Sequence, residues 1–154
     1  MGSWKGYSSY GTSALGIDFS FKGLDDLLNK IEMAGKNIDD AAADAVQQAA
    51  PVLLEAQKEG AARHRKGAGK YGTDAIYDAI ESGHVFREAN FTSIQIGIDL
   101  KKHPEAAHAV FQEYGDGHSP EFPDPFIRPS VDMNKTKING IMRKVLKKWG
   151  VPVE

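Results

Sequence analysis

Apolar and polar positions along this chain follow two periods, and the change between them separates strands from helices. In the run 92–98 apolar residues alternate with polar or small ones, and one face carries Ile94, Ile96 and Ile98. This alternation predicts a half-buried β-strand, and the run 84–87 predicts the second strand of an antiparallel hairpin. A shorter alternation over 17–21 predicts a further strand.

Three segments before residue 83 have the three-to-four-residue spacing of helices. A short helix is predicted over 24–31. A longer one begins near Asn37 and carries a stripe of small apolar residues, with a kink expected at Pro51 because proline removes a backbone donor. A two-turn helix capped by Thr73 is expected to end at Gly83.

A last, C-terminal helix is predicted to begin at Asp124-Pro125, read as the N-cap and the first helical residue, and to end at Gly150. Its inward positions are predicted to be Phe126, Ile127, Val131, Ile138, Ile141, Met142, Val145, Leu146 and Trp149.

Strands and helices do not alternate as βαβ units, which favours an α+β fold. We expect a small antiparallel sheet of three or four strands, packed by a long kinked N-terminal helix and a C-terminal helix. Residues 1–16 are expected to be a flexible arm, and 17–150 a single domain. The arm lacks the apolar run of a signal peptide, and no segment approaches the ~20 apolar residues of a membrane span, so we expect a soluble intracellular protein without a membrane partner.

Composition narrows the chemistry. The 154 residues include no cysteine, which excludes disulfides and thiolate metal sites. The formal net charge is −2, but two neighbouring segments of the chain carry opposite charge. The segment 103–127 contains acids but no Lys or Arg: Glu105, Glu113, Asp116, Glu121 and Asp124. The segment 135–148 contains cations but no acid: Lys135, Lys137, Arg143, Lys144, Lys147 and Lys148. These segments could pair, within one chain or between copies, or form two separately solvated faces.

The acidic segment also contains the most distinctive stretch of the chain, residues 107–132. Apolar residues at Ala107, Val110, Phe111 and Tyr114 predict a short helix within residues 104–114, although strand pairing could instead draw this segment into the sheet. Gly115 suits a left-handed cap at the end of this helix. The prolines of the following loop are expected to keep it extended and stiff.

Catalytic and cofactor motifs are weak. Gly67-x-Gly69-x-x-Gly72 matches the dinucleotide fingerprint in letters, but a predicted helix precedes it where the fingerprint needs a strand. His103, His108 and Glu113 recur every five residues, which is not the spacing of metal ligands on a helix, and His118 lies in the acidic loop. We therefore expect no catalytic residue, cofactor or metal; a small metal-dependent enzyme is the less favoured alternative.

Nucleic acid is the stronger alternative ligand. The loop 63–70 contains four cations, and contacts to phosphate require only such a patch. A DNA-contacting module without sequence preference would use Arg63, Arg65, Lys66 and Lys70.

Four motifs in order resemble the neck and tail-completion proteins of tailed bacteriophages, the tail-component family related to head–tail joining. They are Phe19-x-Phe21-x-Gly23-Leu24-Asp25-x-Leu27-Leu28, Ile96-Gly97-Ile98, Ala109-x-x-x-Glu113-Tyr114-Gly115 and Pro125-Phe126-Ile127-Arg128-Pro129. The last two are the most specific, and the resemblance spans residues 17–149. Around residues 63–73 the chain departs from the family pattern, because Gly72-Thr73 stand in reversed order and the basic loop is longer.

The resemblance implies a non-enzymatic protein of the virion neck, made in the cytoplasm of the bacterial host. Its implied partners are copies of itself in a ring, the connector or head-completion proteins and the tail-terminator proteins, with DNA in the channel. The residues expected to shape the contact loop are Glu113, Tyr114, Gly115, Phe126, Arg128 and Pro129. Between subunits, Glu121 and Asp124 are expected to face Arg143, Lys144 or Lys147.

Overall fold

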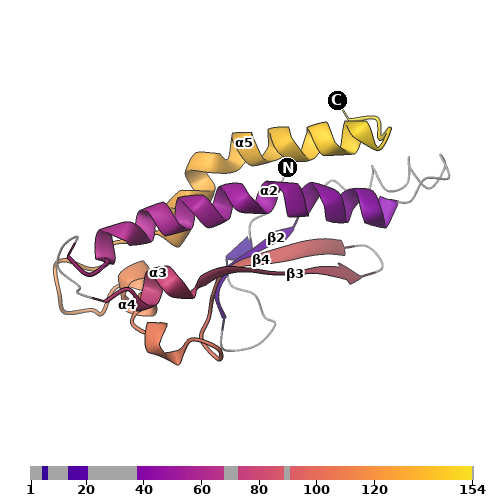
Figure 1. The fold of residues 1–154 in the computed structure, drawn as a ribbon. Helices are drawn as coiled ribbons and strands as arrows, with labels where there is room; N and C mark the ends of the chain where they lie inside the picture. The colour runs from indigo at the N-terminus through magenta and orange to yellow at the C-terminus, as the bar shows by residue number, and fades with distance from the viewer. Residues whose placement is uncertain (1–4, 7–13, 21–37, 68–72, 89–90, 154) are drawn as a thin grey trace.

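The computed structural model describes residues 5–6, 14–20, 38–67, 73–88 and 91–153, which form an α+β fold of three stacked layers. An antiparallel sheet is one outer layer, helix α2 (Ile38–Ala61) is the middle layer, and helix α5 (Ile127–Lys148) is the other outer layer (Figure 1). The predicted α+β class is confirmed. The predicted helix over 24–31 lies outside the described residues.

The sheet has the strand order β1-β2-β4-β3, and all neighbouring strands are antiparallel. Its strands are β1 (Lys5–Gly6), β2 (Ala14–Ser20), β3 (Ile80–Glu88) and β4 (Phe91–Asp99). The predicted hairpin is confirmed as β3–β4. Gly83 does not end a helix as expected; it lies inside β3, where the register shifts between Ser82 and Val85. The expected arm also differs, because Lys5–Gly6 and Ala14–Gly16 belong to strands of the sheet.

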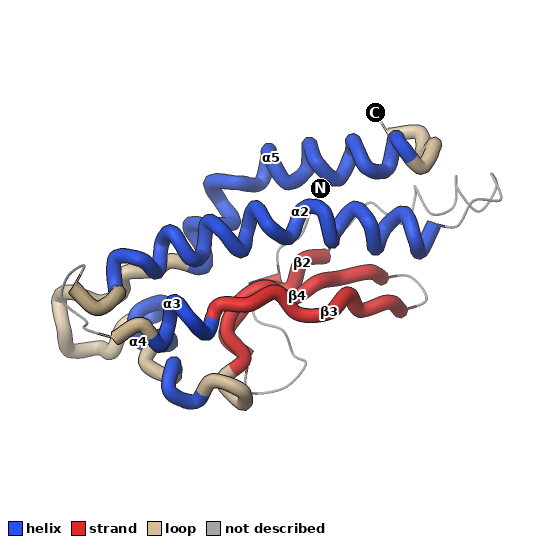
Figure 2. Tube along the Cα trace, viewed as in Figure 1, coloured by secondary structure: helices blue, strands red, loops and turns tan. Residues whose placement is uncertain are grey.

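Short elements connect the layers at one end of the molecule (Figure 2). They are the 3₁₀ turns η1 (Ala62–His64) and η2 (Pro104–Ala106) and the helices α3 (Ala75–Ala79) and α4 (Ala109–Tyr114). Thr73 does not cap α3 as predicted, since the residue before the helix is Asp74, which makes no side-chain capping bond.

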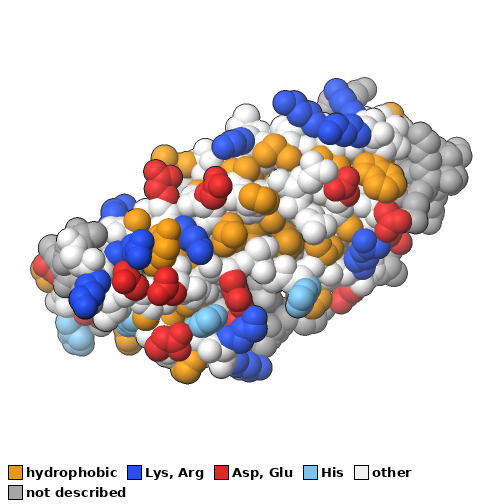
Figure 3. Space-filling model, viewed as in Figure 1, with side chains coloured by type: hydrophobic (Ala, Val, Ile, Leu, Met, Phe, Trp, Pro, Cys, Tyr) orange, Lys and Arg blue, Asp and Glu red, His pale blue; other side chains and the backbone are white. Residues whose placement is uncertain are grey.

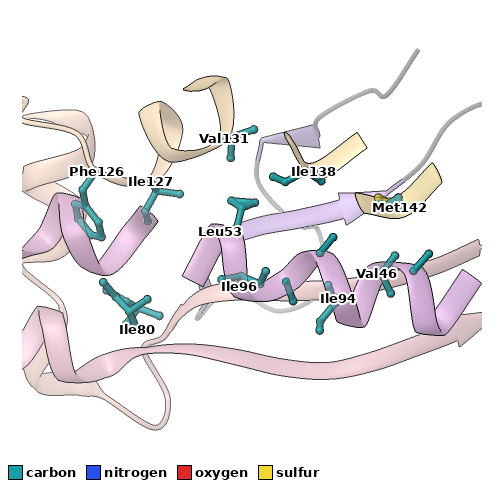
Figure 4. Packing of buried hydrophobic residues seen from close by; sticks show 14 of the residues in the cluster. Val46, Leu53, Ile80, Ile94, Ile96, Phe126, Ile127, Val131, Ile138 and Met142 are labelled. Carbon is teal, nitrogen blue, oxygen red and sulfur yellow. The ribbon is translucent and has the colours of Figure 1, made fainter. Parts of the chain in front are cut away.

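The core lies on both sides of α2. The β4 residues Ile94, Ile96 and Ile98 are buried, as their alternation predicts. Figure 4 shows Leu53 of α2 between Ile96 of the sheet and the α5 residues Val131 and Ile138. Alanines at many other buried α2 positions let a helix pack closely against two layers, because they add little width.

The inward face predicted for α5 is largely confirmed, with one exception at its end. Ile127, Val131, Ile138, Met142, Val145 and Leu146 are all buried. Trp149, predicted to point inward, is 39% exposed, and its indole N–H donates to the Asp44 carboxylate at 2.9 Å. An indole whose N–H needs an acceptor is satisfied at the rim of the core rather than within it.

Candidate functional site

The first turn of α5 is capped by a carboxylate from another helix. Glu113, at the end of α4, is fully buried, and its two carboxylate oxygens accept the backbone N–H groups of Phe126 and Ile127 at 3.0 Å and of Arg128 at 3.1 Å. The first N–H groups of a helix have no partner within the helix, and its N-terminus attracts negative charge. Pro129 has no N–H group, so it leaves no further donor unpaired in this turn.

The predicted cap at Asp124-Pro125 is therefore wrong. The helix begins at Ile127, two residues later than Pro125, and Asp124 has a different role. Its backbone N–H donates to the Gln112 carbonyl at 2.8 Å, and its carboxylate pairs with Arg63 at 2.9 Å. The N-cap residue itself is Phe126, whose side chain is apolar and buried, so capping is left to Glu113.

Arg128 contacts Glu113 from the solvent side, and we call this contact between the end of α4 and the start of α5 the α4–α5 junction. Its Nε donates to the Glu113 carboxylate at 3.0 Å, and its Nη2 donates to the Glu113 backbone carbonyl at 2.7 Å. The guanidinium also lies over the Tyr114 ring, 5.2 Å from its centre, a cation–π geometry. The side chain remains 55% exposed, so the junction displays an arginine and a tyrosine to solvent.

The α4 helix turns two aromatic residues of its apolar stripe toward solvent, while Val110 packs against the core. Phe111 is 53% exposed and Tyr114 is 47% exposed, whereas Gln112 and Glu113 are buried together with Ala109. The reason is tertiary: Glu113 must point inward to reach the start of α5. That rotation carries the aromatic side chains three residues apart onto the surface.

The loop from 115 to 125 is fixed by local hydrogen bonds. Gly115 has φ +91° and ψ 160°, so its φ is positive, but its backbone is not in the left-handed helical conformation predicted for the cap. Its N–H donates to the Phe111 carbonyl at 2.7 Å. The Asp116 carboxylate accepts the N–H groups of His118 and Ser119 and the Ser119 hydroxyl. These bonds, chiefly those from Ser119, lower the pKa of Asp116 to about 2. Glu121 is exposed on this loop.

Two cations of the basic loop are neutralised within the chain. Arg63 pairs with Asp124 and also donates to the Pro125 carbonyl at 3.2 Å. Arg65 pairs with Asp74 at 2.9 Å and stacks over the Tyr77 ring at 4.2 Å. The Lys66 side chain is exposed, and Lys70 lies outside the described residues, as do Gly69 and Gly72 of the nucleotide-like motif. These contacts hold the loop against neighbouring segments of the chain. Among the loop residues that the structure describes, Lys66 is the exposed Lys or Arg side chain without an ion pair.

The histidines do not converge. His103 contacts Glu105 at 3.1 Å, and the His108 ring lies 3.4 Å from the Thr73 hydroxyl. Across the described ranges, no three His, Asp or Glu side chains are grouped so that they could hold a metal ion.

The predicted cations Arg143, Lys144 and Lys147 are exposed near the C-terminal end of α5, far from Glu121 and Asp124. A helix rises ~1.5 Å per residue, so this end lies roughly 30 Å from the helix start beside which the acidic loop ends. The structure therefore does not bring the two predicted charge partners together within one chain.

A hollow lies between α2 and β3. This half-open pocket of about 230 Å³ is lined by apolar side chains, including Leu54, Val85 and Ile94, with Gln47, Ser82 and His84 at its polar positions. Its small volume and mixed lining suit a single side chain better than a cofactor.

No family model, curated protein or solved structure matches the chain. Among the described helices, none combines the length and apolar character that crossing a bilayer requires.

Proposed function

We propose that the chain is a structural subunit of the head–tail connector, or neck, of a tailed phage or prophage. It acts in tail completion and head–tail joining through ring contacts with copies of itself and with the connector, head-completion and tail-terminator proteins. On this proposal its place is the neck of the virion, after synthesis in the host cytoplasm.

One observation carries the proposal. The two motifs on which the resemblance chiefly rests, around Glu113-Tyr114-Gly115 and Phe126-Ile127-Arg128-Pro129, meet in space through the capping carboxylate and the Arg128 side chain. The end of α4 and the start of α5, more than ten residues apart in sequence, are thus held together by direct hydrogen bonds. This supports the proposal that the two motifs together shape one contact surface.

The surface beside the α4–α5 junction has the composition of a protein contact. Phe111 and Tyr114 are large exposed aromatics on one side of α4, and Arg128 stacks on Tyr114. Tyrosine and arginine are enriched among residues that dominate binding energy, and a surface held rigid before binding loses less entropy when a partner docks. Asp124 already pairs with Arg63, so docking through the aromatics does not depend on that carboxylate.

A gene-replacement experiment tests the proposal. In the phage or prophage that encodes the chain, a null allele is expected to give filled heads and separate tails in electron micrographs of the lysate. A Phe111→Ser/Tyr114→Ser allele should reproduce this defect, and a Phe86→Ser allele, which changes an exposed aromatic on β3, should not. Normally joined particles from the null allele would refute the proposal.

A further inference from the structure

Five cations in the second half of α5 differ from Arg63 and Arg65 of the 63–70 loop, which are each held in an ion pair. The exposed side chains of Lys137, Arg143, Lys144, Lys147 and Lys148 make no ion pair with any described residue. Figure 3 shows Lys and Arg side chains gathered over the C-terminal half of α5, whereas blue and red are interleaved at the opposite end of the molecule.

The fold holds these five cations in a fixed array. The apolar side of α5, including Ile138, Met142 and Val145, is buried in the core, so the helix cannot rotate its charged side away from solvent. At ~1.5 Å per residue, the array from Lys137 to Lys148 is roughly 16 Å long. Phosphates of one DNA strand follow each other by ~3.4 Å along the duplex axis, so the array can meet several of them.

A glycine lies in the middle of the charged side. Gly140 is three residues after Lys137 and three before Arg143, and a Cβ added there would meet no atom within 4 Å. Packing therefore does not require a glycine, although glycine in a helix interior costs about 1 kcal/mol relative to alanine. Glycine does permit another backbone to approach the helix closely between flanking cations.

The surface around these cations exposes no large apolar side chain of α5, and this indicates which kind of partner it could bind. Among the described residues, the large exposed hydrophobic side chains of α5 and its C-cap are Met133 and Trp149, beyond the two ends of the array. Protein contacts usually centre on apolar and aromatic groups, and an interfacial helix inserts an apolar face into the membrane. A cationic surface without either suits phosphates.

We propose that the solvent face of the second half of α5, carrying Lys137, Arg143, Lys144, Lys147 and Lys148, binds the phosphate backbone of duplex DNA without reading base sequence. This inference is independent of the neck proposal, because it concerns a different surface and a different ligand. It also moves the DNA contact from the 63–70 loop, where Arg63 and Arg65 are paired, to these five cations of α5, which make no ion pair with a described residue.

Fluorescence anisotropy with a labelled 30-base-pair duplex of arbitrary sequence tests the inference in a salt series from about 50 mM. Wild-type chain should bind with a slope of log K against log salt of about −3 to −4.5, as three to five phosphate contacts require. An Arg143→Gln/Lys144→Gln/Lys147→Gln variant should bind at least about tenfold more weakly and lose nearly 3 from the slope.

Two comparisons separate a binding face from general charge or misfolding. A Lys66→Gln/Lys101→Gln/Lys102→Gln variant has the same net charge as the α5 variant, and its affinity should stay within about twofold of wild type. Gly140→Gln should weaken DNA binding several-fold while leaving the melting temperature unchanged or higher, because glutamine is the better helix former.

Other results would overturn the inference. If the wild-type chain does not bind DNA at the lowest salt, the cationic face of α5 is only solvated. If the Lys66→Gln/Lys101→Gln/Lys102→Gln variant loses as much DNA affinity as the α5 variant, DNA binds elsewhere or responds only to net charge. Equal binding of poly-glutamate, or preferential binding of phosphatidylserine vesicles, would assign the face to an acidic protein or a membrane. None of these DNA-binding results determines whether heads and tails join in the gene-replacement experiment. The DNA-binding proposal and the neck proposal can therefore fail independently.

Discussion

Glu113 and Arg128 lie 15 residues apart in sequence and meet at 3.0 Å, with the carboxylate fully buried and the guanidinium half exposed. Through this pair the end of α4 is joined to the start of α5. The same carboxylate also satisfies three backbone donors, so one buried charge fixes the direction in which α5 leaves the loop. This contact therefore also positions the loop 115–125 and the exposed aromatic residues of α4.

Replacing the capping carboxylate should destabilise the protein strongly. Glu113→Gln keeps the shape but turns an amide NH₂ toward backbone donors, so we expect the free energy of unfolding to fall by about 2–4 kcal/mol. Urea denaturation measures this change. Glu105→Gln, an exposed acid on the same segment, should change it by no more than about 0.5 kcal/mol. A Glu113 variant as stable as the Glu105 variant would show that the cap contributes little.

The sequence predicts what depends on local pattern. The β3–β4 hairpin and the buried face of α5 follow from the periodicity of residues such as Ile94, Ile96 and Val131, and the structure agrees. The orientation of α4 does not follow from its pattern. Phe111 and Tyr114 are turned outward because Glu113 bonds to a helix that begins fourteen residues later, and no local period encodes such a contact.

Charge pairing was equally hidden in the sequence. Arg63 and Arg65 form part of an uninterrupted basic run, yet their partners Asp124 and Asp74 come from other parts of the chain. The sequence of the 63–70 loop therefore suggests more unpaired positive charge than the folded chain has. For α5 the sequence is a better guide, because a 22-residue helix without an acid after Asp132 provides no local partner for its later cations.

Gly115 should not tolerate a side chain. Its φ of +91° is disfavoured for other residues, and an added Cβ would lie 3.4 Å from Pro123 Cδ. We expect Gly115→Ala to lower the free energy of unfolding by about 1–3 kcal/mol, measured by urea denaturation. Gly140→Ala is the matched comparison and should raise it by about 0.5–1 kcal/mol, since that glycine lies in an open helical position. The idea fails if both alanine variants shift stability in the same direction.

The loop should weaken in acid because of Asp116. Its folded pKa of about 2 is below the ordinary 3.8, so its stabilising effect is complete above pH 4 and is lost as pH falls toward 2. Asp116→Asn should therefore melt at a lower temperature than wild type at pH 6, and the two should converge near pH 2. Thermal melts followed by circular dichroism across this range check the point; a constant difference at all pH values would argue against it.

The buried amide of Gln57 should be dispensable, unlike the carboxylate of Glu113. Its Nε2 donates to the Ile96 carbonyl at a long 3.3 Å, and its Oε1 has no hydrogen-bond partner among the described atoms. Gln57→Met has nearly the same volume and removes an unpaired polar atom, so stability should be unchanged or rise by about 1 kcal/mol. A loss above about 2 kcal/mol in urea denaturation would mean that the amide is satisfied in solution.

If the chain is part of a phage neck, as we propose, it must be found at one place in the virion. Particles of the encoding phage or prophage can be purified, labelled with gold-conjugated antibody against the chain and viewed by electron microscopy. A particle preparation from the null allele gives the background. The neck proposal predicts gold at the junction between head and tail. Gold confined to the tail tip or the capsid shell, or particles that contain none of the chain, would contradict it.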